Sequence, residues 1–256
     1  MKLTFDLEKA KGYKSPSQIA RVLTEDWCGR NLFCASCEKK SLDHAPDNTS
    51  VYDFVCSECS ETYQLKSRSK PLRDKVLDSA YAPMINAVKS NKAPNLFLLH
   101  YNPQKYLVEN LIVVPRYFLS ASCVEPRKPL SADARRAGWV GCNIVLKQLP
   151  VDGRISIIRE RQSIKPDIVR AQYNRFKFLS DKRYDLRGWT ADVLKTLREM
   201  KKKDFSLKDA YAFESSLKVL HPDNRHIQAK IRQQLQMLRD RGILRFLGNG
   251  RYSFLY

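Results

Sequence analysis

The chain has 256 residues, of which 43% are hydrophobic, so it can form one large domain or a medium and a small one with real cores. Lysine and arginine outnumber aspartate and glutamate by 46 to 27, which leaves a formal charge of +19. Such a field predicts a polyanionic partner, because basic side chains that neutralise phosphates release counterions. The sequence has no apolar run of transmembrane length and no lipidation signal, so we expect nucleic acid rather than a membrane.

The N-terminal segment carries acidic residues where a secretory signal would have an apolar core. Seven cysteines, an odd number, then favour a reducing cytoplasm in which thiols bind metal rather than form disulfides.

Helical and strand-like patterns alternate over roughly the first 180 residues. Ser15-Pro16 is typical of a helix start, and apolar residues then recur at helical spacing up to residue 31. The same spacing predicts helices over residues 72–88 and 165–178. Short apolar segments predict strands at 51–55, 62–66, 95–102, 110–118 and 154–159. Because 95–102 and 110–118 are almost continuously apolar, we expect a mixed sheet covered on both faces.

A polar segment at 180–188 separates a C-terminal part with a different pattern. We expect one helix with Thr190 as N-cap, and a second with Ser206 as N-cap and Asp209 three residues later. A third helix ends before Gly242, and a strand, a Gly-Asn-Gly turn and another strand follow. This order predicts a winged helix over 183–256, after an N-terminal domain over 1–182, in a two-domain α+β protein.

Two Cys-x-x-Cys pairs, Cys34/Cys37 and Cys56/Cys59, are separated by a loop of eighteen residues. This spacing is typical of a tetrahedral four-cysteine zinc site. Four protein ligands leave no open position for water, so the pattern predicts a structural Zn²⁺ rather than a catalytic one. The alternative is four inert thiols.

An acidic residue, Asp53, precedes the second cysteine pair, and Gln64 and Lys66 follow it on an expected strand. Residues two apart on a strand share a face, so Gln64 and Lys66 project together, and the intervening turn can bring Asp53 beside them. Oxygen atoms of Asp53, Gln64 and the Leu65 carbonyl could hold a Mg²⁺ ion, with Lys66 next to a scissile phosphate. The alternative is an edge hairpin with a solvated lysine and glutamine.

The third helix of the C-terminal part has basic and amide side chains on its expected outer face. The DNA contacts expected there are His226, Arg232, Gln233 and Gln234. Glutamine can pair with adenine and arginine with guanine in the major groove. Arg251 and Tyr252 in the wing are expected to contact the DNA backbone. The alternative is an ordinary solvated helix face.

Several segments together resemble the DpnI-like methyl-directed restriction endonucleases over essentially the whole chain. They are LTEDW, the cysteine block ending in LKS, ARRAGWVGCNI, RGWT and KIRQQLQMLRD. The resemblance implies a PD-(D/E)XK nuclease domain with a zinc knuckle, followed by a winged helix. It also implies Asp53, Gln64 and Lys66 as the catalytic residues, and Mg²⁺-dependent cleavage of double-stranded DNA at adenine-methylated GATC by a monomer.

The resemblance also suggests where the methyl group is read. Trp139, between two glycines, is the candidate wall of a methyladenine pocket, with Arg135 and Arg136 holding phosphates or reading guanine. A core tryptophan is the alternative. Gln64 stands where the family pattern has glutamate, and Tyr52 where it has proline. Because of Gln64, the alternative function is a methyladenine-DNA binding protein or regulator with weak or no catalysis.

Overall fold

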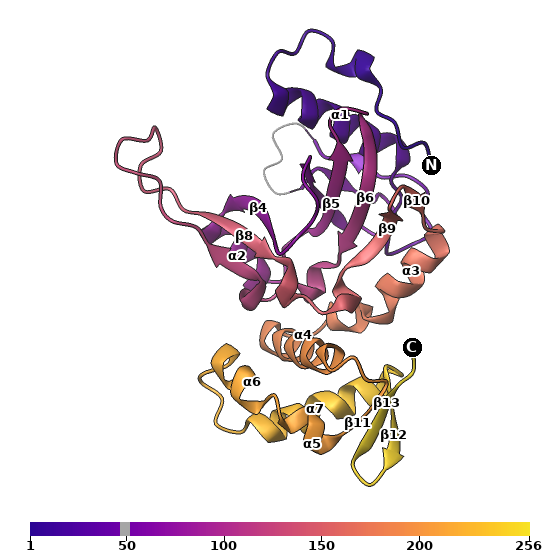
Figure 1. Ribbon diagram of the computed structural model, residues 1–256, viewed down its shortest axis with the longest axis vertical. Coiled ribbons are helices and arrows are strands. Elements are labelled where there is room, and N and C mark those ends of the chain that lie inside the picture. Colours follow the sequence, from indigo (N-terminus) through magenta and orange to yellow (C-terminus); the bar gives the residue numbers. More distant parts are fainter. Residues whose placement is uncertain (47–51) are drawn as a thin grey trace.

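The computed structural model describes residues 1–46 and 52–256, which form two lobes that meet along one helix (Figure 1). Within these residues the N-terminal lobe contains a seven-stranded and a three-stranded sheet, and the C-terminal lobe contains another three-stranded sheet. The expected strand at 51–55 lies partly outside the described residues.

The large sheet has the strand order β1-β2-β3-β5-β6-β9-β10. Its strands are β1 (Asp43–His44), β2 (Phe54–Val55), β3 (Thr62–Arg68), β5 (Asn95–Asn102), β6 (Leu107–Val114), β9 (Ile155–Arg159) and β10 (Gln162–Ser163). Only the β3–β5 pair is parallel among the described strands of this sheet, so the sheet is mixed as expected. Leu96, Phe97, Leu98 and Leu99 of β5 are all fully buried, which confirms that the sheet is covered on both faces.

Three helices complete the N-terminal lobe: α1 (Pro16–Asn31), α2 (Tyr81–Lys89) and α3 (Pro166–Arg175). Helix α1 packs against β3, and α3 packs against β9. Pro16 occupies the first turn of α1, where its missing N–H costs no hydrogen bond. The helices that the sequence predicts over residues 15–31 and 165–178 are therefore confirmed.

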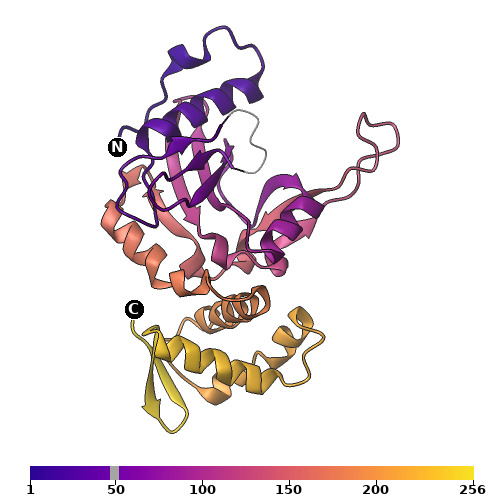
Figure 2. The same ribbon diagram turned by 180° about the vertical axis from the view of Figure 1, so that it is seen from behind.

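The small sheet of this lobe has the order β4-β8-β7 and packs beside α2. Its strands are β4 (Lys75–Ala80), β7 (Val124–Pro126) and β8 (Gly141–Val145). The connection between β7 and β8 extends away from the rest of the molecule (Figures 1 and 2). The helix expected over 72–88 was wrong in its first half, because residues 75–77 pair with Val145, Ile144 and Asn143 of β8 instead. Pairing with the distant strand β8 outweighed the helical spacing of the local apolar residues.

The C-terminal lobe is a helix-turn-helix domain with a wing. Its elements are α4 (Tyr184–Glu199), β11 (Asp204–Ser206), α5 (Leu207–Tyr211), α6 (Glu214–Leu220), α7 (Ile227–Asp240), β12 (Leu244–Gly248) and β13 (Arg251–Phe254). Ser206 and Asp209 form the expected capping box, and Gly242 beyond α7 has a positive φ of 67°. The wing turn also follows the prediction, since Gly248, Asn249 and Gly250 all have positive φ.

Two expectations for this lobe were wrong. Thr190 is not an N-cap, because α4 begins six residues earlier and Thr190 lies inside it, donating to the carbonyl of Leu186. The polar segment that suggested a boundary becomes helical from Tyr184 onward, and Arg187 and Trp189 of this helix are buried. The second expected helix is divided into α5 and α6 at Ala212 and Phe213.

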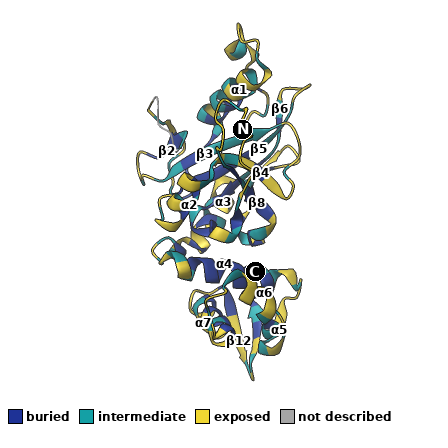
Figure 3. Cartoon of the chain, turned by 90° about the vertical axis from the view of Figure 1, so that its left-hand side faces the viewer, coloured by how far each residue is buried: buried dark blue, intermediate teal, exposed yellow. Residues whose placement is uncertain are grey.

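Helix α4 lies between the two lobes and is largely buried (Figure 3). On one side Arg187 donates from Nη2 to the Val88 carbonyl at 3.0 Å, and Arg198 pairs with Asp152 at 2.7 Å. On the other side α4 packs against α7. Among the described residues, no helix combines the length and apolar character needed to cross a membrane.

Candidate active site and DNA-binding surface

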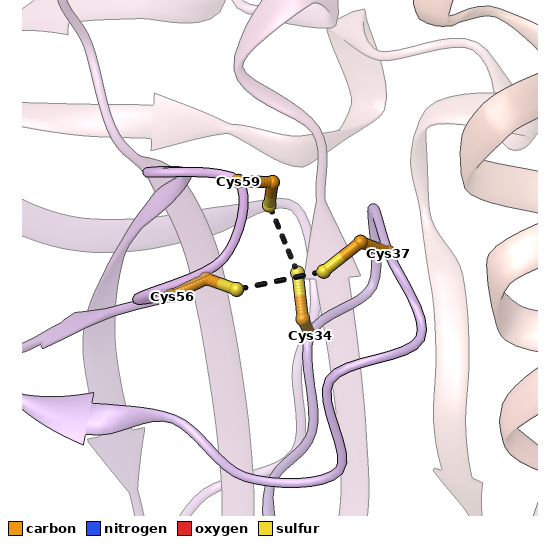
Figure 4. A group of neighbouring side chains, drawn as sticks. All are labelled: Cys34, Cys37, Cys56 and Cys59. Atoms are coloured by element: carbon orange, nitrogen blue, oxygen red, sulfur yellow. Dashed lines mark hydrogen bonds between the residues drawn. The ribbon is translucent and has the colours of Figure 1, made fainter.

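The four cysteines of the two pairs converge at one point (Figure 4). Their sulfur atoms all lie within 4.8 Å of one another, and Cys34–Cys59 and Cys37–Cys56 are each 3.5 Å apart. Tetrahedral zinc with Zn–S bonds of about 2.3 Å places sulfurs about 3.8 Å apart. The cluster is therefore compatible with a structural zinc ion.

The protonation chemistry of the cluster fits the same interpretation. Burial raises the pKa of Cys37 to about 11 and raises the pKa of Cys59 further. The neighbouring Cys34 thiol adds to both shifts. The pKa of Cys56 is lowered instead, because hydrogen bonds from the backbone of Cys59 and Glu58 outweigh the effect of burial. Four thiolates at this spacing therefore need a cation to compensate their charge, since a metal ligand must be deprotonated.

The cysteine cluster is fastened to the rest of the lobe. The Tyr63 hydroxyl lies 3.2 Å from Cys34 Sγ, and it accepts a hydrogen bond from the Ala35 N–H. Arg170 of α3 donates to the carbonyls of Cys34 and Lys39. Tyr63 belongs to β3, so the cluster and the candidate catalytic strand form one rigid unit.

Asp53 lies directly against the middle of β3. Its Oδ2 accepts a hydrogen bond of 2.6 Å from the N–H of Leu65, the residue between Gln64 and Lys66. Its own N–H donates to the Tyr63 carbonyl. In a strand the N–H and C=O of one residue point to the same side, so the Leu65 carbonyl faces the space beside Asp53. The structure thus places the Asp53 carboxylate against the backbone of Leu65, which is flanked on β3 by Gln64 and Lys66.

The Lys66 side chain has a partner that the sequence patterns did not single out. Its Nζ lies 2.6 Å from Oδ1 of Asp78 in β4. The Lys66 side chain is 21% exposed, and the Asp78 side chain is fully buried. In the sequence Asp78 is one of several charged residues over 73–78, and the wrong helix assignment for 72–88 concealed its place on a strand beside Lys66.

A cavity of about 580 Å³ opens beside Lys66, between β3 and the small sheet. Its basic lining consists of Lys66, Arg68, Lys70 and Lys75. Tyr101 and Asn143 also line it, so it offers aromatic and amide groups next to positive charge. A concave basic surface beside a candidate catalytic lysine can accept a nucleic-acid strand.

Helix α1 contributes a second acid near Asp53. Burial raises the pKa of Glu25, Arg21 opposes the shift, and the charge of Asp53 adds to it. Glu25 also has an ion pair of 4.0 Å with Arg21. The site therefore has more negative charge close to Asp53 than the Asp-Gln-Lys pattern shows.

The β7–β8 connection carries Arg135, Arg136 and Trp139. Both arginines are exposed, and the Arg136 guanidinium lies 4.8 Å from the centre of the Trp139 ring. The other end of the indole packs so closely on Gly141 that a Cβ there would come within 2.8 Å of it. Trp139 is thus half-buried in a projecting loop, not in the core.

In the winged helix, His226, Arg232 and Gln233 are exposed on α7 as expected. Gln234 is a correction: it is fully buried, and its Oε1 accepts a hydrogen bond of 2.8 Å from Thr190. Consecutive residues of a helix differ by about 100° in direction, which turns Gln234 towards α4 while Gln233 faces outward.

The two wing residues differ in the same way. Arg251 is exposed, whereas the Tyr252 ring is buried and stacks on Phe205 with centroids 5.7 Å apart. Adjacent residues of a strand point to opposite faces, so Tyr252 packs inside the lobe and Arg251 faces solvent. The expected contact between Tyr252 and the DNA backbone is therefore wrong, because the ring packs inside the lobe.

These features define a two-domain α+β protein that joins a mixed-sheet domain with a four-cysteine cluster to a helix-turn-helix DNA-binding domain. Residues 1–182 match the family model for DpnI, the Dam-replacing family, and residues 185–253 match the model for the Dam-replacing HTH domain. The chain belongs to this DpnI, or Dam-replacing, family. The resemblance to methyl-directed restriction enzymes with a winged helix is thereby confirmed.

The contrast within the wing gives a stability prediction. Tyr252→Ala should lower the free energy of unfolding by about 3 kcal/mol, because it empties an aromatic position in the core. Arg251→Ala should change it by less than about 0.5 kcal/mol. Urea denaturation of both variants measures the difference. Similar values for the two would contradict the assignment of Tyr252 to the core.

Proposed function

We propose that the protein is a restriction endonuclease that hydrolyses double-stranded DNA at adenine-methylated GATC in a Mg²⁺-dependent reaction. Family membership supports the class of enzyme. The observation that carries the catalytic assignment is the 2.6 Å hydrogen bond from Leu65 to Asp53, which holds the carboxylate against the β3 residue that separates Gln64 from Lys66 in the sequence. The basic cavity beside Lys66 would receive the strand that is cut.

The donor set fits Mg²⁺, because carboxylate, amide and carbonyl oxygens are hard ligands. Asp53, Gln64 and the Leu65 carbonyl would hold the ion. When bound, it would supply positive charge that stabilises the phosphodiester as negative charge develops on it. Lys66 would donate hydrogen bonds to a non-bridging phosphate oxygen. One water is consumed, and the products are a 3′-hydroxyl and a 5′-phosphate.

Methyl recognition requires more than one contact. Burying one methyl group contributes only about 0.8 kcal/mol, so strong discrimination needs both methyl groups of the duplex or both lobes. In the winged helix we assign base reading to His226, Arg232 and Gln233, with Arg251 on the backbone. In the nuclease lobe Trp139 would form one side of the methyl pocket. Arg136 would first move from the face of the Trp139 ring to a DNA phosphate, and Arg135 would lie beside Arg136.

A zinc ion in the four-cysteine cluster would hold the loop that sets the position of Asp53. Its role would be structural, since all four ligands come from the protein.

The second candidate function is a methyladenine-DNA binding protein with little catalysis. Gln64 favours it, because a neutral amide compensates less of the charge of a cation than a glutamate would. The two functions differ in one assay.

Plasmid DNA from a methylating and a non-methylating host separates the two functions. With Mg²⁺, the protein should convert the methylated plasmid into discrete fragments and leave the other intact. Sequencing of the ends then gives the cut position. Gel retention of the methylated DNA without any cutting, in Mg²⁺ and in Mn²⁺, would support the binding protein instead.

Restoring the family acid should strengthen cation binding. Gln64→Glu should lower the Mg²⁺ concentration for half-maximal cleavage by about tenfold, because it adds a full negative charge to the ligand set. A metal titration of cleavage by both proteins measures this. An unchanged midpoint would argue against Gln64 as a ligand.

Zinc removal should weaken the whole N-terminal lobe. Cys37→Ser should reduce bound zinc from one per chain to nearly none and lower Tm by about 10 °C, on the order of 4 kcal/mol for a chain of this size. Cys123→Ala, a buried thiol outside the cluster, should keep its zinc. Elemental analysis and calorimetry test both, and full zinc content in Cys37→Ser would refute the ligand set.

A further inference from the structure

The contact between Lys66 and Asp78 joins the two sheets of the N-terminal lobe. Lys66 belongs to β3 of the large sheet, and Asp78 belongs to β4 of the small sheet. Their charged atoms are 2.6 Å apart. Asp78 Oδ1 is buried and accepts no hydrogen bond of regular geometry, so the ammonium is the group that compensates its charge.

An irregularity in the small sheet surrounds Asp78. The register of β4 against β8 shifts between Leu77 and Ala80, and Asp78 lies in this interval. Bulges of this kind redirect side chains and occur next to active sites. The neighbouring Cys142 thiol, 4.0 Å from Asp78 Oδ2, is itself buried. Burial raises the pKa of Cys142 to about 11, and the charge of Asp78 adds to this shift.

Stability alone is a poor explanation for such a pair. Removing two charges from water costs several kcal/mol per ion, and well-packed apolar side chains are often as stable or more so. The pair therefore points to a role for the ammonium itself. That role requires Lys66 to stay in one position at the edge of the basic cavity.

Asp78 also changes the charge balance of the site. Asp53 and Lys66 alone would be neutral as a pair, since Gln64 carries no charge. With Asp78 the group has one net negative charge, the same as an Asp-Glu-Lys set. Because the Asp78 side chain is fully buried, it cannot reach substrate or a cation, and it can act only through Lys66.

We propose that Asp78 is a positioning residue of the site, which holds the Lys66 ammonium in the direction of the scissile phosphate. This inference deepens the proposed nuclease function and rests on it. It assigns a role to a residue from the small sheet, outside the Asp-Gln-Lys pattern. The function of the small sheet is then to complete the site as well as to carry the β7–β8 loop.

The first test does not depend on cleavage. Acylation of Lys66 by an amine-reactive ester, followed by peptide mass spectrometry, measures how freely the amine can leave its ion pair and react. Asp78→Asn should raise the acylation rate of Lys66 at least about tenfold, because the carboxylate that holds the ammonium at 2.6 Å is gone. Asp152→Asn, which breaks the buried pair with Arg198, is the matched control and should leave Lys66 unchanged.

The second test uses single-turnover cleavage of methylated DNA with saturating enzyme. Asp78→Asn should reduce the cleavage rate about 100-fold with less than about threefold change in DNA affinity, and Asp78→Glu should restore part of it. In a Lys66→Ala background, Asp78→Asn should cost nothing further. Asp152→Asn should cleave at the rate of the original protein once fully folded, as monitored by circular dichroism.

The outcomes separate the two proposals. Unchanged Lys66 acylation in Asp78→Asn, or a further 100-fold loss in the Lys66→Ala background, would overturn the role of Asp78. If the original protein does not cleave methylated DNA at all, the nuclease function fails, and the acylation result still decides whether Asp78 holds Lys66.

Discussion

The hydrogen bond from the Leu65 N–H to the Asp53 carboxylate is the interaction on which the candidate site depends. Strand β2 has only two residues, and its pairing with β3 ends at Phe54 and Tyr63. Beyond that point the Asp53 side chain replaces a backbone acceptor and satisfies the next donor of β3. A carboxylate held in this way has a fixed position relative to Gln64 and Lys66.

The register of that strand pair is set by the cysteine turn. Cys56 pairs with Glu61 across the turn, and Ser60 adopts a positive φ of 59°. A shift of one residue would move Gln64 and Lys66 to the opposite face of the sheet. A structural metal at the cysteine cluster would therefore be linked mechanically to the candidate site. It would fix the turn, the turn would fix the register, and the register would set the position of Lys66.

Local features of the sequence predicted most of the fold, and long-range contacts account for the errors. The α1 start, the capping box at Ser206, the glycine after α7 and the buried strand β5 all depend on neighbouring residues, and all are confirmed. Strand β4 was taken for a helix because its partner β8 lies more than sixty residues away. Thr190 was expected to cap a helix and Gln234 to face DNA. Both predictions were wrong, because the two side chains contact each other between α4 and α7.

The same distinction applies to the site. The four cysteines could be grouped from their spacing alone. The position of Asp53 beside Leu65 could also be predicted, because a single turn of the chain joins the two residues. Asp78 could not be found, since its relation to Lys66 depends on how two sheets pack. The outward position of Gln233 on α7 was predicted and the burial of Gln234 was missed, a difference of one position that only the packing of α4 decides.

The carboxylates near Lys66 bear on the choice between enzyme and binding protein. In a chain with a charge of +19 that binds a polyanion, negative groups beside a basic cavity weaken binding, because they repel phosphate. A protein that only bound DNA would gain affinity from apolar or basic residues at positions 53 and 78. Both carboxylates instead occupy fixed positions, one on a backbone N–H and one on the lysine. That arrangement favours a site that holds a cation and keeps an ammonium aligned, which are requirements of phosphodiester hydrolysis and not of binding.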